Sequence, residues 1–312
     1  MTAAPVRTVF LGSGGFGRPA LEALAGSAAV DLVGVVTAPP RPAGRRAHPT
    51  PTVIETTARS LGVDTILVPP RLRDPEAVAT VLARRPDLVV LADYGQIVPG
   101  PLLDLQHGAL NLHPSLLPRH RGATPVPAAI LADDPETGVS LMRMDAGLDT
   151  GPIVAQARCA VDGTEVAPTL EARLADMGAE LLLTWLAPWL AGDVTPTRQD
   201  DAAASLTRPF RRSDGQLDTA RSAVELERRI RALQPWPGSF LETGLGRLVV
   251  WSGAVEDGLG EASKPGVFDA RGVRTADGHL RLIEVQPAGG KRMPWDAFVR
   301  GRPSIIGSSI VA

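Results

Sequence analysis

The most telling stretch of this sequence is Asn111-Leu112-His113-Pro114-Ser115-Leu116-Leu117-Pro118, followed later by Met144-Asp145-Ala146-Gly147-Leu148-Asp149-Thr150-Gly151. We predict that the first stretch begins as a buried strand over residues 109–113, because that run is mostly apolar. Side chains two residues apart on a strand share a face. Asn111 and His113 should therefore project together from the end of this strand into one pocket.

The amide, the imidazole and the later carboxylate of Asp149 are a set that can support acyl transfer. An amide N–H can bind an oxyanion, an imidazole can move a proton, and a carboxylate can orient the imidazole. Each residue also has a simpler explanation. Asn111 can satisfy backbone groups at a strand end, His113 can be a buried core histidine, and Asp149 can form a turn. Their occurrence in one ordered frame favours the catalytic interpretation.

Strand and helix patterns alternate on both sides of this stretch. We predict strands at 8–11, 31–37, 65–68, 87–92, 109–113 and 139–144, with helices at 19–24, 75–85 and 169–190. Alternation of this kind is typical of βαβ units. The fold class expected for the N-terminal part is therefore α/β and Rossmann-like, with a mostly parallel sheet.

A different pattern follows residue 190. Residues 191–205 contain glycine, proline and an alanine run, which predicts a linker. Beyond them we predict a helix at 222–233 and short strands at 247–251, 266–269, 272–275 and 279–285, a spacing typical of a small, OB-like β-barrel. The expected domains are 1–190, a linker at 191–205, and a C-terminal β-barrel domain at 206–312.

Composition limits the class of protein. Hydrophobic residues make up 44% of the 312 residues and charged residues 21%, which is typical of folded domains. No apolar run reaches the roughly 18 residues of a membrane span, and the first residues lack the pattern of a secretory signal. Cys159 is the only cysteine, so an internal disulfide is excluded. A cytoplasmic protein is expected.

Charge is distributed unevenly along the chain. Residues 1–205 carry 16 basic and 22 acidic side chains, whereas residues 206–312 carry 16 basic and 12 acidic ones. A basic C-terminal part favours an anionic partner such as nucleic acid, although a solvated surface often has the same balance. The histidines show no metal-ligand spacing, so we expect no metal.

The loop Gly12-Ser13-Gly14-Gly15-Phe16-Gly17 matches a dinucleotide fingerprint after a first strand and before a helix. The fingerprint also requires an acidic residue at the end of the second strand. That strand ends in Val35-Val36-Thr37-Ala38-Pro39, without Asp or Glu. We therefore expect no NAD, and expect instead a tight turn whose N–H groups can face a substrate phosphate.

Several motifs together resemble the folate-dependent formyltransferases. The central ones are Asn111-x-His113, Ser115-Leu116-Leu117-Pro118, Arg119-x-Arg121-Gly122-Ala123 and Leu148-Asp149-Thr150-Gly151. Others lie on both sides: Arg41-Pro42-Ala43-Gly44-Arg45, Asp93-Tyr94-Gly95-Gln96-Ile97-Val98-Pro99, Glu136-Thr137-Gly138-Val139, Arg229 through Pro237, and Val285 through Lys291. The resemblance covers almost the whole chain and is strongest to the branch that formylates methionyl initiator tRNA.

That resemblance implies a reaction and an active centre. The formyl group of 10-formyltetrahydrofolate would pass to the α-amine of methionine on initiator tRNA through a tetrahedral intermediate, without a covalent enzyme intermediate. Asn111 would donate to the oxyanion. His113 would sit charged or relay the proton, and Asp149 would favour its imidazolium.

The resemblance also implies binding residues. Ser115, Leu116, Leu117 and Pro118 match the family's folate-binding segment, and Tyr94 and Gly95 would border the pterin pocket. Arg41, Arg45 and Arg46 lie where the family's tRNA-contacting loop lies. This loop is shorter than usual and carries arginine where the family is rich in lysine, and the glycine loop contains one glycine more than the family pattern. A monomer is expected.

Other functions share these residues. A formyltransferase acting on a sugar-nucleotide amine or on glycinamide ribonucleotide would also use Asn111, His113 and Asp149, and a formyl-folate hydrolase would use water in place of the amine. A non-catalytic tRNA-binding or dinucleotide-binding module is the alternative from a different class. Tests with these acceptors, and folate turnover without NAD, would separate the possibilities.

Overall fold

The structure is a computed structural model that describes residues 4–43, 48–256 and 264–311. The chain divides into two compact units. One comprises Met1–Pro125, Glu136–Ala160 and Glu171–Arg208, and the other comprises Val126–Pro135, Val161–Leu170 and Pro209–Ala312. The domain boundaries predicted from the sequence, 1–190 and 206–312, remain a prediction.

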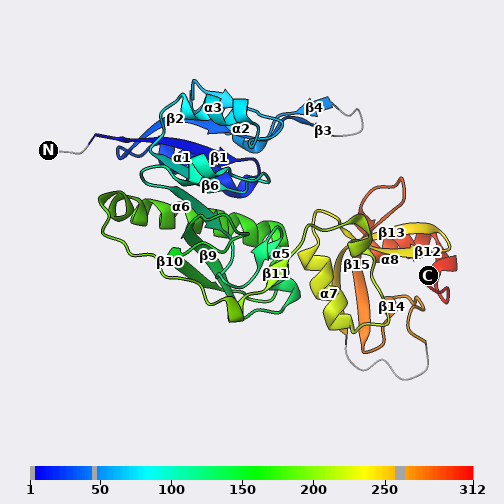
Figure 1. Ribbon diagram of the computed structural model, residues 1–312. Helices are drawn as coiled ribbons and strands as arrows, with labels where there is room; N and C mark the ends of the chain where they lie inside the picture. The colour runs from blue at the N-terminus through cyan, green and yellow to red at the C-terminus, as the bar shows by residue number, and fades with distance from the viewer. Residues whose placement is uncertain (1–3, 44–47, 257–263, 312) are drawn as a thin grey trace. The chain divides into compact units, whose positions relative to one another are not determined.

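The first unit is built on a seven-stranded sheet with strand order β10-β9-β7-β6-β1-β2-β5 (Figure 1). The strands are β1 (Val6–Gly12), β2 (Val30–Val36), β5 (Ile66–Leu67), β6 (Leu88–Ala92), β7 (Ala109–His113), β9 (Glu136–Arg143) and β10 (Ile153–Ala160). Six of them point in the same direction, and β9 alone runs antiparallel to its neighbours β7 and β10. The predicted α/β class with a mostly parallel sheet is confirmed.

Helices lie between and after these strands in the chain. They are α1 (Arg18–Ala25), α2 (Val53–Ser60), α3 (Pro75–Leu82), α4 (Gly100–Leu103), α5 (Pro125–Leu131), α6 (Ala167–Ala191) and the 3-10 helices η1 (Gly15–Gly17) and η2 (Asp201–Ala203). Local sequence accounts for their ends. The α2 helix begins where the Thr52 hydroxyl accepts a hydrogen bond from the Glu55 N–H, and Pro19 and Pro75 stand in the first turns of α1 and α3.

The order of connections creates a crevice in the sheet. From β1 the chain moves outward to β2 and β5, and then returns to β6 and β7 on the other side of β1. The loops that leave β1 and β6 therefore diverge at the carboxyl ends of neighbouring strands. In sheets of this kind, ligands bind outside such a switch point.

The second unit contains an antiparallel sheet. Its strands are β12 (Ser239–Thr243), β13 (Gly246–Glu256), β14 (Gly272–Arg274), β15 (His279–Pro287) and β16 (Met293–Pro294), joined by α7 (Ala223–Ala232), α8 (Trp295–Gly301) and the 3-10 helices η3 (Arg212–Gly215) and η4 (Pro303–Ile305). The sheet runs β12-β13-β15-β14, and isolated bridges link β14 back to β12: Val273–Phe268, Val267–Ser309 and Ile310–Thr243. The pairing thus closes into the small barrel that the strand spacing predicts.

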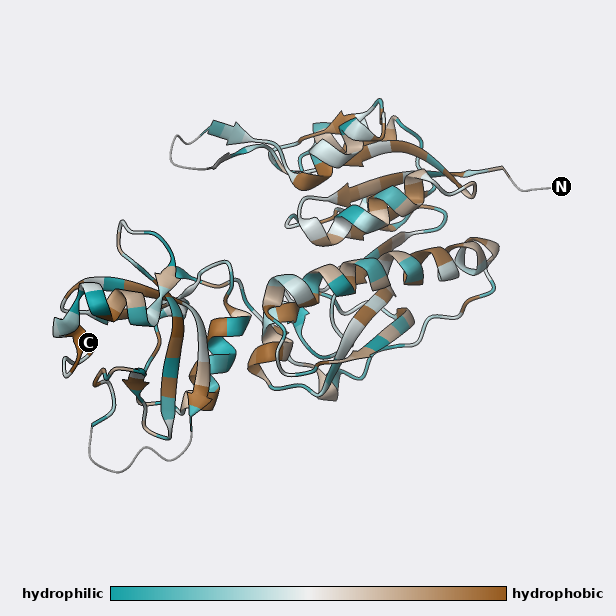
Figure 2. Cartoon of the chain, turned by 180° about the vertical axis from the view of Figure 1, so that it is seen from behind, coloured by the Kyte–Doolittle hydropathy of each residue, from teal (hydrophilic) through white to brown (hydrophobic). Residues whose placement is uncertain are grey.

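Apolar side chains lie inside each unit. In the second unit, Leu226 and Ile230 of α7 join a buried cluster with Phe268, Trp295 and Phe298. Figure 2 shows brown, hydrophobic stretches along strands of both sheets, whereas α7 displays many hydrophilic residues. Among the described residues, no helix is both long and apolar enough to cross a membrane.

Two predicted features differ in detail from the structure. Within the strand predicted at 266–269, only Val267 and Phe268 are paired, and they form isolated bridges. The end of the segment predicted as a linker is paired with the first unit: Thr197 bridges to Ile153, and β11 (Leu206–Thr207), just beyond it, pairs with β8 (Arg121–Gly122). We call residues 197–207 the strap.

Candidate active site

Asn111 and His113 lie at the carboxyl end of β7. Each is only 5% exposed. Asn111 is paired with Leu91 of β6 and Met142 of β9, so the strand has neighbours on both edges. The intervening Leu112 is also buried, near Gly178 of α6, and the alternation of β7 puts the two polar residues on the opposite face. The strand thus carries an amide and an imidazole together into the protein interior.

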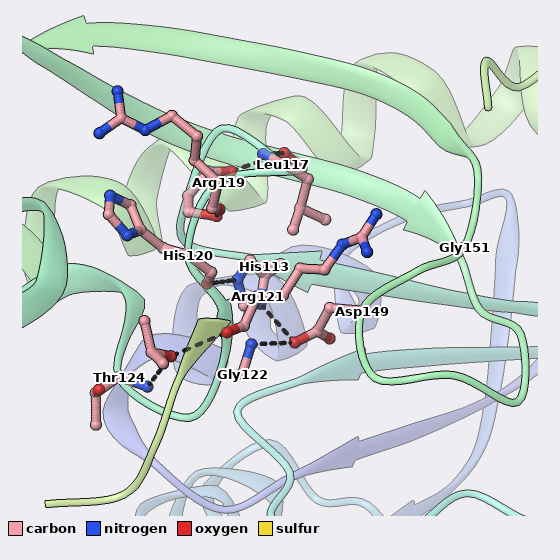
Figure 3. Close-up of polar contacts among 12 residues, drawn as sticks. His113, Leu117, Arg119, His120, Arg121, Gly122, Thr124, Asp149 and Gly151 are labelled. Carbon is pink, nitrogen blue, oxygen red and sulfur yellow. Dashed lines mark hydrogen bonds and ion pairs between the residues drawn. The ribbon is translucent and has the colours of Figure 1, made fainter. Parts of the chain in front are cut away.

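The orientation of the His113 ring determines its protonation. Its Nε2 lies 2.9 Å from the backbone oxygen of His120. A carbonyl oxygen only accepts hydrogen bonds, so Nε2 carries the proton. In the neutral ring Nδ1 is then unprotonated, and it lies 3.7 Å from Oδ2 of Asp149 (Figure 3). His113 therefore presents a base at Nδ1 next to a carboxylate.

Asp149 is held in place by backbone groups. Its Oδ2 accepts a hydrogen bond of 2.7 Å from the Gly122 N–H, and its own φ is 52°, a left-handed conformation that Asp tolerates better than most residues. Gly151 approaches β9 closely, because a Cβ there would lie 1.9 Å from the backbone oxygen of Arg143. The structure brings Asp149 to His113 although 35 residues separate them in the sequence.

Burial controls the charge of His113. Removal from water lowers the pKa of the imidazole and is the largest effect; Asp149 and the hydrogen bond to His120 act in the opposite direction, and the charge of His120 adds a small lowering. The net direction is downward from the ordinary value of about 6.5. A lowered pKa favours the neutral ring over the imidazolium, and a neutral ring can act as a proton relay.

Asn111 has an unused acceptor. Its Oδ1 is buried and accepts no hydrogen bond from any residue that the structure describes. A buried polar atom without a partner typically costs about 1–3 kcal/mol of stability. Such an atom at the end of a strand, beside a buried base, is suited to a ligand.

The residues predicted to bind folate at 115–118 are either buried or half-buried. Ser115 and Leu117 are buried in a turn that hydrogen bonds stabilise. The Ser115 hydroxyl donates to the backbone oxygen of Arg119, and the Leu117 N–H donates to Ser140 Oγ. Leu116 and Pro118 are half-buried. The side chains of Ser115 and Leu117 thus shape the turn from inside.

Tyr94 and Gly95 follow β6. The Tyr94 ring belongs to the buried cluster that contains Val9 and Leu91, and burial raises the pKa of its hydroxyl to about 12. Gly95 is exposed on the wall of a cavity. The two neighbours therefore differ: Tyr94 supports the loop and Gly95 faces solvent.

A cavity of about 760 Å³ lies at the switch point of the sheet. Its wall includes three arginines, one carboxylate and the 70% exposed side chain of Ile97; the charged residues are Arg41, Arg71, Arg73 and Asp93. Among the described residues, its lining does not include Asn111, His113 or Asp149. Asp93 nevertheless follows Ala92, which is paired with Leu112 of β7, so this wall and the strand end are neighbours.

The additional glycine of the first loop has a steric explanation. A Cβ on Gly14 would lie 1.6 Å from Oδ2 of Asp93, so any side chain at position 14 would displace that carboxylate. The Ser13 N–H also donates to the Asp93 backbone oxygen, and Ser13 Oγ accepts from the Ala38 N–H. The loop is therefore tied to two strand ends, and desolvation at this wall raises the pKa of the Asp93 carboxyl.

Of the three arginines predicted to contact tRNA, the structure describes only Arg41. Arg41 begins β3 (Arg41–Ala43), which pairs with β4 (His48–Thr50), and it lines the cavity. Arg45 and Arg46 lie outside the described residues. The described residues also contain no group of three or more His, Cys, Asp or Glu side chains arranged to hold a metal ion.

Two buried residues next to Asp149, Arg121 and Gln199, had no predicted role. Both are 5% exposed, and Arg121 donates from Nε and Nη2 to the Gln199 side-chain oxygen. The only sequence signal was the position of Arg121 within a family motif. Gln199 lies in the segment predicted to be a linker, so nothing nearby in the sequence pointed to it.

Comparison with known proteins identifies the family of this chain. Residues 6–186 match the model of the "Formyl transferase" family, and residues 210–303 match "Formyl transferase, C-terminal domain". The chain belongs to the formyl transferase family. Methionyl-tRNA formyltransferase of Roseiflexus sp. is 41% identical over 95% of this chain and 93% of that protein, and the enzyme of the same name from Thermus thermophilus is 41% identical over 95% and 96%.

Solved structures share the fold of this formyl transferase. The N-formyltransferase from Helicobacter canadensis, crystallised with folinic acid and dTDP-3-aminofucose, aligns with a TM-score of 0.64 at 13% identity, over 92% of this chain and all of that one. HypX from Aquifex aeolicus aligns with a TM-score of 0.61 at 18% identity. That alignment covers 96% of this chain but only 49% of the longer HypX chain.

Proposed function

We propose that this formyl transferase moves the formyl group of 10-formyltetrahydrofolate to the α-amine of methionyl initiator tRNA. The names of relatives that match it over nearly its full length support this acceptor. The observation that carries the proposal is the unprotonated Nδ1 of buried His113, with Asp149 3.7 Å from it and Asn111 two residues away on the same strand face.

Asn111 supplies the electrostatic part of the reaction. When the amine attacks the formyl carbon, negative charge develops on the formyl oxygen, and the buried amide N–H can donate to it. Removal of one such donor typically costs about 3–4 kcal/mol of barrier. The free Oδ1 acceptor on the same side chain can meanwhile hold an N–H of the substrate.

His113 supplies the proton transfer. As the N–C bond forms, Nδ1 accepts a proton from the attacking amine while Nε2–H stays bonded to His120. Asp149 stabilises the imidazolium that results. The same proton then passes to the folate nitrogen as its bond to the formyl carbon breaks. Because His113 begins neutral, no prior deprotonation of the base is needed at neutral pH.

Both substrates have suitable surroundings. For the folate, we propose the region of Gly95 and the turn at 115–118, with Tyr94, Ser115 and Leu117 shaping it from inside. For the aminoacylated end of the tRNA, we propose the arginine-lined part of the same cavity, where Arg41, Arg71 and Arg73 can pair with phosphate. Arg45 and Arg46 and the basic C-terminal part would extend this contact.

The decisive experiment offers labelled 10-formyltetrahydrofolate to methionyl initiator tRNA, with uncharged tRNA, glycinamide ribonucleotide and a UDP-amino sugar as parallel acceptors. We expect label on the charged tRNA alone. Label on a sugar nucleotide or on the ribonucleotide would replace the acceptor in this proposal. Release of formate in every reaction would indicate a hydrolase.

A further inference from the structure

The surroundings of Asp149 contain a second layer of contacts that the reaction scheme above does not use. Gln199, on the strap, donates from its Nε2 to the backbone oxygens of Asp149 at 2.8 Å and Gly151 at 2.6 Å. These two oxygens lie on either side of Thr150, so a single side chain holds the turn from both ends. Gln199 itself is 5% exposed.

Arg121 fixes which way the Gln199 amide faces. Its Nε and Nη2 both donate to Gln199 Oε1, at 3.1 and 2.9 Å. A guanidinium has no acceptor, so the amide oxygen must face Arg121 and the amide N–H₂ must face the two carbonyls. Asp201, also on the strap, accepts from Arg121 Nη2 at 2.8 Å and balances its charge.

The same short strand also holds the Asp149 carboxylate. Gly122, which follows Arg121 on β8, donates its N–H to Asp149 Oδ2, the same oxygen that faces Nδ1 of His113 (Figure 3). The pairing of β8 with β11 attaches both residues to the strap. The backbone of Asp149 is thus held by the strap, and its carboxylate is held by β8, which is paired with the strap.

We propose that Gln199, oriented by Arg121, is a positioning residue that sets the distance between Asp149 and His113. The inference rests on the function proposed above, because it assumes that Asp149 acts on His113. Loss of the two bonds to the turn would let Asp149 move away from the imidazole. The transition-state imidazolium would lose stabilisation, whereas the contacts that bind the substrates would stay in place.

The test uses the full-length chain with Gln199→Met, which removes the hydrogen bonds without adding charge. We expect kcat for formyl transfer to fall about 10- to 100-fold, the range that loss of a positioning contact commonly gives, with KM for both substrates little changed. Because the Asp149 charge raises the pKa of His113, its displacement should also move the acid limb of the pH–rate profile to lower pH.

Two comparisons separate positioning from a general loss of structure. Gln106→Met changes an exposed glutamine in the turn before β7, at the other end of that strand, and should leave kcat unchanged. In an Asp149→Asn background, Gln199→Met should lower kcat by no more than about twofold further, because residues that act through one another are not additive.

The inference fails if Gln199→Met lowers only the melting temperature and keeps wild-type kcat below it, or if its effect on kcat is fully additive with that of Asp149→Asn. If Gln199→Met does not fold, Arg121→Lys applies the same tests, since it keeps the charge for Asp201 but cannot make the two-pronged contact. A wild-type chain that transfers no formyl group would overturn the proposed function instead.

Discussion

At the scale of single residues, the centre depends on buried groups whose partners come from elsewhere in the chain. His113 is buried deeply enough that its pKa falls in spite of a neighbouring carboxylate, and its tautomer is set by one backbone oxygen. The chemical types were visible in the sequence. The tautomer and the direction of the pKa shift were not, because both depend on His120 and on burial.

Close backbone packing is the second requirement at this scale. A Cβ on Gly151 would lie 1.9 Å from the Arg143 backbone oxygen, so Gly151→Ala must shift the turn that carries Asp149. We predict a loss of about 1–3 kcal/mol in the free energy of unfolding, measured by urea denaturation. Gly15→Ala is the matched control, because a Cβ there would meet nothing within 4 Å. Equal stability of the two variants would show that the close approach is unimportant.

At the scale of elements, regular patterns were predictable and irregular ones were not. The strand at 109–113 has the predicted bounds, and α6 at Ala167–Ala191 differs from the predicted 169–190 by only a few residues. In contrast, β10 was not predicted, because Gln156, Arg158 and Cys159 interrupt its apolar pattern. The strap seemed to be a linker because its polar residues serve partners that are distant in the sequence.

The C-terminal residues are predicted to stabilise the barrel. Ser308, Ile310 and Val311 make backbone hydrogen bonds to Phe268, Gly266 and Glu242, and the bridges of Ser309 and Ile310 complete the closure of the sheet. We predict that a chain ending at Gly307 loses several kcal/mol of unfolding free energy, roughly 1 kcal/mol for each lost bond plus the loss of Ile310 packing. A chain ending at Val311 is the control. Identical urea midpoints would show that closure contributes nothing.

At the scale of the whole molecule, acidic and basic side chains are unevenly distributed along the chain. The basic side chains outnumber the acidic ones only after residue 205. If the C-terminal part contacts the tRNA backbone, a chain ending at Arg208, which keeps the strap, should have weaker tRNA affinity and a shallower dependence of log affinity on log salt than the full chain. Binding measured at several salt concentrations checks this. An unchanged slope would remove the C-terminal part from the contact.

The central claim is that neutral His113 accepts the proton while Asp149 stabilises the charge that forms. The measurement that tests it most directly is the pH dependence of kcat for the wild type and for Asp149→Asn. Activity should rise with pH through the lowered pKa of His113 and then level off, because only the neutral ring accepts a proton. In Asp149→Asn the plateau should fall strongly and the acid limb should move to lower pH, since the charge that raised this pKa is gone. A plateau near the wild-type level, or an acid limb that does not move, would contradict the account.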